Sequence, residues 1–90
     1  LSSASSVTVF LGLQTLQGSN PNMVSQKGAR IIVHPSYSAV TNDNDIALLQ
    51  LASSVTFTPY ITPVCLAASG STFYSGVSSW VTGWGNTASG

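Results

Sequence analysis

Residues 42–51, NDNDIALLQL, contain the clearest change of character in the chain, from four polar residues to a nearly continuous apolar run. The first two polar residues end a loop that we predict over residues 36–43, and residues 46–51 have the composition of a strand. Because Gln50 is the one polar residue in this run, we expect the strand to be buried on both faces. The stretch therefore predicts a sheet with a central apolar strand that follows directly after a polar loop.

Two further strands are predicted before this stretch and one after it. Residues 7–13 are apolar and β-branched, and residues 28–33 end in Ile-Ile-Val and are stopped by Pro35, which cannot donate to a sheet ladder. Residues 77–85 return to strand-like composition. No stretch of ten residues has a convincing helical period, so we predict an all-β fold with long loops.

The segments between these strands are rich in residues that form turns. Gly-Ser-Asn-Pro-Asn at positions 18–22 predicts a surface loop. Prolines punctuate residues 53–59 and 62–66, where they oppose helix and favour an extended connector. An extended connector between groups of strands indicates two sub-domains.

The composition is unusual for its low charge. Charged side chains make up 4% of the 90 residues and the formal net charge is zero, whereas serine and threonine fill 25 positions. Two cations cannot neutralise a row of phosphates, so we expect no nucleic-acid partner. No apolar run approaches the roughly 18 residues of a membrane-spanning helix, and no signal peptide precedes the first strand. We expect the chain to start after processing or inside a longer protein.

Metal-binding and cross-linking side chains are scarce. Cys65 is the single cysteine and cannot close an internal disulfide, and one cysteine with one histidine cannot complete a zinc site of three or four protein ligands. We therefore expect no metal and no cofactor. A chain of this length buries only about 60 to 65% of its unfolded surface, so we expect it to be marginally stable alone.

Asp45 is the first candidate for chemistry, because it lies where the polar loop meets the apolar run. A carboxylate drawn into an apolar environment must be paired or hydrogen-bonded, and the chain offers only Lys27, Arg30 and His34 as partners. A buried Asp45 would then interact with a group elsewhere. The alternative is a plain turn or strand-cap aspartate, which is the simpler interpretation for Asp45 and also for Asp43.

Three other residues have both a chemical and a structural interpretation. His34 is a possible general base or a structural histidine at a strand end, and no Ser or Cys motif nearby marks a nucleophile. Cys65 is either an inert buried thiol or half of a bridge to another segment or chain. Trp84 lies between two glycines, and we expect it to be a packing anchor more than a ligand platform.

Taken in order, five segments resemble the middle of a chymotrypsin/trypsin-like serine protease, especially its tryptase, prostasin and testisin-like branch. Residues 7–12, VTVFLG, are similar to the strand that follows the catalytic-histidine region, and residues 31–37, IIVHPSY, to the family's Ile-x-x-His-Pro-x-Tyr segment. Residues 44–51, NDIALLQL, resemble the segment that bears the triad aspartate. Residues 62–66, TPVCL, resemble the inter-barrel connector, and residues 80–86, WVTGWGN, the opening of the second barrel.

The resemblance implies a double six-stranded antiparallel β-barrel, of which this chain would be part. Residues 1–52 would be the C-terminal part of the first barrel, residues 53–76 the connector and a loop, and residues 77–90 the start of the second barrel. Asp45 would be the triad aspartate that orients the catalytic histidine. That histidine would lie before Leu1 and the nucleophilic serine after the last residue, so the isolated chain should be inactive and fold poorly.

The resemblance also assigns the remaining candidates. His34 falls on a non-catalytic histidine of the family, and Cys65 on a cysteine that pairs with the propeptide or light chain of the zymogen. Ser79 stands where many relatives carry a cysteine, so a disulfide of the second barrel is expected to be absent. Protein or peptide substrates and protease inhibitors would be the partners, and the protein would be secreted or held at the extracellular face of the plasma membrane.

Two other functions stay open at this point. A non-catalytic homologue could keep the double barrel and Asp45 while using the fold as a binding or scaffold module. A free-standing small β adhesion domain is disfavoured, because so short a secreted chain would need disulfides. Specificity for the substrate side chain is not encoded in these residues, since the family's specificity pocket lies outside them.

Overall fold

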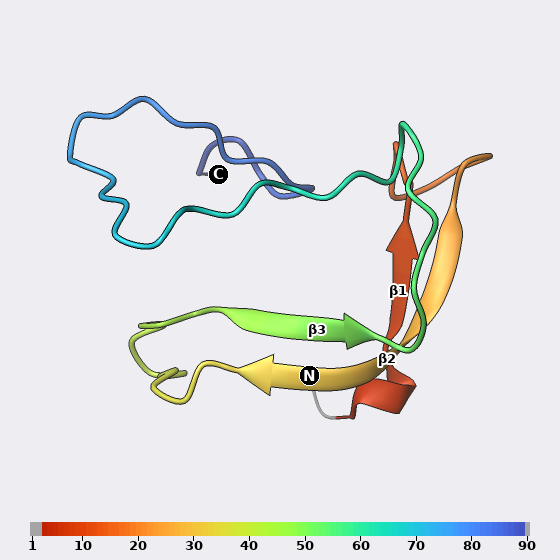
Figure 1. The fold of residues 1–90 in the computed structure, drawn as a ribbon, viewed down its shortest axis with the longest axis horizontal. Helices are drawn as coiled ribbons and strands as arrows, with labels where there is room; N and C mark the ends of the chain where they lie inside the picture. The colour runs from red at the N-terminus through yellow and green to blue at the C-terminus, as the bar shows by residue number, and fades with distance from the viewer. Residues whose placement is uncertain (1–2, 90) are drawn as a thin grey trace.

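The computed structural model describes residues 3–89, which form a short 3-10 turn and three strands (Figure 1). The turn η1 spans Ala4–Ser6, and the strands are β1 (Thr8–Leu11), β2 (Val24–Val33) and β3 (Ala47–Leu51). The strands form one antiparallel sheet in the order β1-β2-β3. The predicted all-β class is confirmed. The described residues also contain no helix with the length and apolar character needed to cross a membrane.

Strand β2 is the centre of the sheet and pairs with a different neighbour along each half of its length. Thr8 of β1 pairs with Lys27, and beyond that point β3 pairs with β2 from Gly28↔Leu51 to Val33↔Ala47. The Gly28 amide donates to Val7 at 3.1 Å, whereas the Lys27 carbonyl accepts from Ala52 at 2.8 Å. Since these two groups point to opposite edges of β2, β1 and β3 lie on opposite sides of it.

A register shift between Gly28 and Arg30 coincides with the change of partner. Such a bulge bends a strand and increases its twist. Figure 1 shows the result: β2 curves away from the direction of β1 and then runs alongside β3. The sheet is therefore bent at its middle strand.

Gly28 is the buried residue at this bend. A Cβ built on Gly28 would lie 2.6 Å from the carbonyl oxygen of Ala4 in η1, closer than real Cβ atoms approach backbone oxygens. The absence of a side chain thus lets η1 pack directly on β2.

The expectation that residues 46–51 are buried on both faces is wrong for this structure. Leu48 is 65% exposed and Leu49, on the opposite face, is 40% exposed. The strand is apolar on both faces, as predicted, but in residues 3–89 the sheet is a single layer, so no second layer covers either face. Ile61, outside the strands, is the buried apolar side chain of the described residues, with 6% exposure.

The first part of the connector folds back onto the sheet. Thr58 and Ile61 form an antiparallel bridge whose two backbone hydrogen bonds measure 2.9 and 3.1 Å, with Pro59 at the second position of the turn. Ile61 packs beside Gly12, just after β1, because a Cβ at Gly12 would be 3.3 Å from the Ile61 Cγ1. This contact explains why Ile61 is buried.

Residues 62–89 run on without a strand, so the strand predicted over residues 77–85 does not form here. A strand needs a neighbouring strand to satisfy its amides and carbonyls, and no strand pairs with this segment in the described part of the chain. Trp84 is 55% exposed, so within the described residues it does not act as the packing anchor that we expected. Figure 1 shows the segment as a wide open excursion away from the sheet.

The contact at Gly28 predicts a steric effect on stability. In the complete protein, Gly28→Ala should lower the free energy of unfolding by about 1–3 kcal/mol, because the new methyl group would collide with the Ala4 carbonyl. The parent protein is the reference, and thermal or denaturant unfolding would measure the free energy of unfolding of both. Equal stability of Gly28→Ala and the parent protein would show that η1 does not pack on β2.

Candidate functional site

Asp45 lies at the base of the loop that joins β2 to β3. This loop covers residues 34–46, and the His34 amide closes it by donating to the Ile46 carbonyl at 3.1 Å. The closure continues the β2–β3 pairing by one step beyond Val33↔Ala47. Asp45 thus sits immediately beside the last hydrogen bond of the hairpin.

The alternating Asn-Asp-Asn-Asp sequence has a conformational cause. Asn42 has a φ of 60° and Asn44 a φ of 54°, and these are the non-glycine residues with positive φ in the described chain. Asparagine tolerates this left-handed region better than most residues. The Ile46 amide donates to the Asn44 carbonyl at 2.8 Å, so Asp45 occupies the centre of an inverse γ-turn at the start of β3.

The two aspartates of the loop have different surroundings. The Asp43 Oδ1 accepts the Asn44 amide at 3.1 Å, and the Asp43 carbonyl accepts the Ser38 amide at 3.1 Å. Asp43 is therefore the loop residue that we predicted. The structure shows no hydrogen bond to the Asp45 carboxylate from any of residues 3–89, and Asp45 is exposed.

Asp45 borders a shallow hollow of about 330 Å³. The other residues that line the hollow are Val33, Tyr37, Ile46 and Ala47. The lining is mostly apolar and belongs to the ends of β2 and β3 and to the loop between them. A group that approached Asp45 through this hollow would meet a carboxylate whose oxygens no described residue engages.

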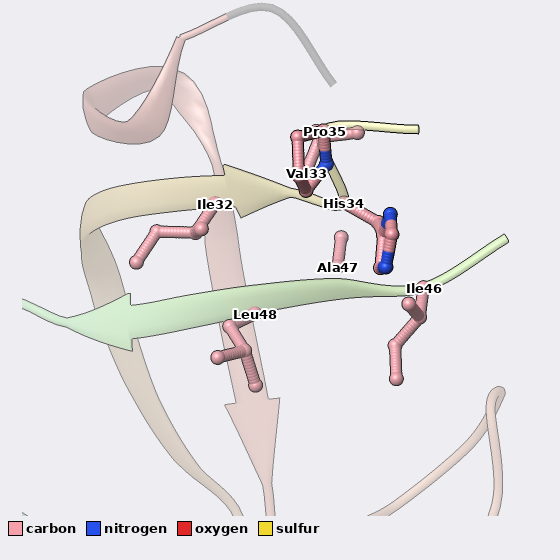
Figure 2. A pocket seen from close by; sticks show the side chains of 7 residues that line it. All are labelled: Ile32, Val33, His34, Pro35, Ile46, Ala47 and Leu48. Atoms are coloured by element: carbon pink, nitrogen blue, oxygen red, sulfur yellow. The ribbon is translucent and has the colours of Figure 1, made fainter. Parts of the chain in front are cut away.

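His34 lies on a different hollow of the same hairpin. This apolar groove of about 290 Å³ is lined by Ile32–Pro35 and Ile46–Leu48. Figure 2 shows Ile32 of β2 and Leu48 of β3, which are paired in register, on the same side of the hairpin. The structure does not bring His34 and Asp45 together as a pair, since they share no hydrogen bond and line separate hollows.

The His34 ring has a partner in the main chain. Its Nδ1 accepts the backbone amide of Ser36 at 3.0 Å. An acceptor at Nδ1 places the ring proton of the neutral form on Nε2. The imidazole therefore caps the turn that leaves β2, and this bond favours the structural interpretation over a general base.

Comparison with known proteins assigns the family. A protein-family profile described as Trypsin matches residues 1–90. The chain belongs to the trypsin-like serine protease family. It is also similar to the suppressor of tumorigenicity 14 protein homolog of Bos taurus, with 47% identity over 81 residues, which are 89% of this chain and 10% of that protein. This trypsin-family chain thus spans about a tenth of the length of the curated relative it matches.

The family assignment confirms the resemblance to a chymotrypsin/trypsin-like serine protease, and the branch within the family stays a prediction. For this trypsin-family chain it also makes the exposure of Cys65 relevant, because the thiol is free within the described chain and open to solvent. Within residues 3–89 the thiol is therefore not buried. The alternative, a bridge to another segment or chain, stays a prediction.

Sequence reasoning missed the residues that surround Asp45. Asn44 donates from its side-chain Nδ2 to the Ser36 carbonyl at 3.2 Å, and Tyr37 lines the hollow beside Asp45. The two asparagines that alternate with the aspartates, Asn42 and Asn44, were the available signal, since Asn in a turn indicates left-handed backbone. The contact with Ser36, eight residues away, has no comparable local signal.

The cap formed by His34 can be tested by a matched pair of variants. His34→Ala removes the acceptor for the Ser36 amide and should lower the free energy of unfolding by about 1 kcal/mol. His34→Asn keeps an acceptor, Oδ1, at the position of the histidine Nδ1, and its free energy of unfolding should fall by less. Unfolding and kcat would be measured in the complete trypsin-family protein. His34→Asn keeps the acceptor and should keep kcat within about twofold, because the cap bond leaves His34 outside the proton transfer. A collapse of kcat in His34→Asn would instead identify His34 as the base.

Proposed function

We propose that the complete protein is a serine endopeptidase that cleaves peptide bonds with a Ser-His-Asp triad, and that Asp45 is the triad aspartate. The observation that carries the proposal is the state of the Asp45 carboxylate. It is exposed on a tight turn, borders a hollow and receives no hydrogen bond from residues 3–89, whereas Asp43 two residues earlier is bonded to its own loop. Family membership supplies the chemistry in which such a carboxylate is used.

In that chemistry the aspartate accepts a hydrogen bond from the catalytic histidine. The bond selects the tautomer whose other nitrogen faces the serine, and it stabilises the imidazolium that forms when the serine attacks the peptide carbonyl. The proton moves from serine to histidine and then to the leaving amine, and Asp45 stays ionised throughout. The histidine and serine would come from parts of the protein outside these 90 residues. Since the reaction is acid–base and nucleophilic, it needs no cofactor.

The division of the chain follows from the same proposal. Residues 1–52, which contain the sheet, would be the C-terminal part of the first barrel, residues 53–76 the connector and loop, and residues 77–90 the start of the second barrel. The exposed apolar side chains support this division. Leu48 on the sheet and Trp80 in the last segment, with exposures of 65% and 97%, would be covered when each barrel is complete.

The proposal extends to partners and location. Protein or peptide substrates and protease inhibitors would bind at the triad, and the protein would act outside the cell, either secreted or anchored at the membrane surface. A zymogen with a propeptide or light chain bonded to Cys65 is consistent with an exposed thiol. A surface with few charges gives no support for a nucleic-acid partner.

The role of Asp45 is tested by Asp45→Asn in the complete protein. We expect kcat for peptide cleavage to fall by about 10⁴-fold with the fold intact, because an asparagine stabilises the wrong histidine tautomer. Asp43→Asn is the matched control, since its amide oxygen can still accept the Asn44 amide, and its kcat should be unchanged. A normal rate in Asp45→Asn would remove Asp45 from the mechanism. A parent protein with no cleavage of any peptide substrate would favour the non-catalytic homologue.

The role of Cys65 is tested separately on the activated protein. After activation cleavage, electrophoresis without reductant should show one species, which splits into two chains when reductant is added. Cys65→Ser should release the second chain without reductant, because the exposed thiol is the attachment point. Two free chains from the unreduced parent protein would contradict the bridge.

A further inference from the structure

Asn44 is held at three of its polar groups, directly before Asp45. Its side-chain Nδ2 donates to the Ser36 carbonyl at 3.2 Å, its amide donates to Asp43 Oδ1 at 3.1 Å, and its carbonyl accepts the Ile46 amide at 2.8 Å. The last of these bonds spans Asp45 and forms the γ-turn. The peptide unit that precedes Asp45 is thus fixed on one side by the start of β3 and on the other by the base of the loop.

The base of the loop is itself well connected. Ser36, which accepts the Asn44 side chain, donates its own amide to the His34 ring at 3.0 Å. His34 in turn closes the hairpin, because its backbone amide donates a hydrogen bond to the Ile46 carbonyl. A continuous set of hydrogen bonds therefore links the end of β2, Ser36, Asn44 and the first residue after Asp45.

The Asp45 carboxylate has no such support of its own from residues 3–89. Within residues 3–89 its direction is therefore set by the backbone that carries it, which has a left-handed φ of 54° at Asn44 and the hydrogen bonds around that residue. We propose that Asn44 is a positioning residue: the hydrogen bond from its side-chain amide to the Ser36 carbonyl holds Asp45 in the orientation that the triad needs. This inference rests on the proposed function of Asp45.

Asn42 provides an internal control within the same loop. It has nearly the same backbone conformation, with a φ of 60°, and its amide donates to the Ser38 carbonyl at 2.7 Å. The structure shows no hydrogen bond from its side chain to residues 3–89. The two asparagines therefore share the left-handed conformation, and only Asn44 has a side-chain hydrogen bond to the base of the loop, at Ser36.

The experiment compares Asn44→Gly with Asn42→Gly in the complete protein. Glycine adopts positive φ freely, so both variants keep the turn, and only Asn44→Gly loses a side-chain hydrogen bond. We expect Asn44→Gly to lower kcat by about 10-fold with KM unchanged, since small displacements of a catalytic group cost up to about 100-fold. We expect Asn42→Gly to keep kcat within about twofold. Both rates would be measured well below the melting temperature of each variant.

A pH profile separates positioning from a general loss of structure. A nearby carboxylate favours the charged form of the catalytic histidine, so displacement of Asp45 should lower the pKa of that histidine. The acidic limb of the kcat/KM profile should therefore move to lower pH in Asn44→Gly. The acidic limb should not move in Asn42→Gly, because that variant keeps the hydrogen bond from the Asn44 side chain to Ser36.

A second variant, Asn44→Asp, keeps a residue that tolerates left-handed backbone but has no N–H to donate to Ser36. It should also lose kcat. A kcat equal to that of the parent protein in either folded Asn44 variant would overturn the positioning role. Failure of both Asn44 variants to fold would also overturn it, because Asn44 would then be needed for stability. If Asp45→Asn retains activity, the proposed function fails. If Asp45→Asn is inactive while the Asn44 and Asn42 variants behave alike, only the positioning role fails.

Discussion

The sheet depends on a steric constraint at the point where β2 changes partner. All strand pairing in residues 3–89 involves β2, which holds β1 along one half and β3 along the other. At the junction η1 lies so close to Gly28 that any side chain would meet the Ala4 carbonyl. The bulge at Gly28–Arg30 then turns the second half of β2, and with it the β2–β3 hairpin. The position of Asp45, at the far end of that hairpin, follows from this bend.

The two aspartates of the loop between β2 and β3 differ in their hydrogen bonding, although they are only two residues apart. Asp43 and Asp45 are separated by one asparagine, yet Asp43 accepts a hydrogen bond within the loop and Asp45 faces a hollow. The residues Asn42 and Asn44, one on each side of Asp43, both have left-handed backbone. The difference between the two aspartates is therefore a difference of backbone conformation, not of residue type.

Much of this arrangement could be predicted from local sequence. The strands predicted at residues 7–13, 28–33 and 46–51 correspond to β1, β2 and β3, although β2 begins earlier, at Val24. Asp45 was singled out from its place at the boundary of the loop, and its role stays a prediction. Burial could not be predicted in the same way, because the exposure of Leu48 depends on a covering layer that no local pattern describes. The expected strand at residues 77–85 failed for the same reason, since its pairing partner is not determined by its own residues. The hydrogen bond from Asn44 to Ser36 could not be predicted from the sequence either, because it depends on how the loop closes.

The β2–β3 hairpin also has a consequence for the behaviour of these residues as a separate fragment. Its pairings join segments that are close in the chain, and contacts of short sequence separation form early in folding. Strand β3 pairs with β2 along one edge, so its other edge and both of its apolar faces stay accessible in the described chain. An accessible apolar edge strand is a template for association with other chains. A fragment made of these residues alone would therefore be prone to associate with other chains through β3.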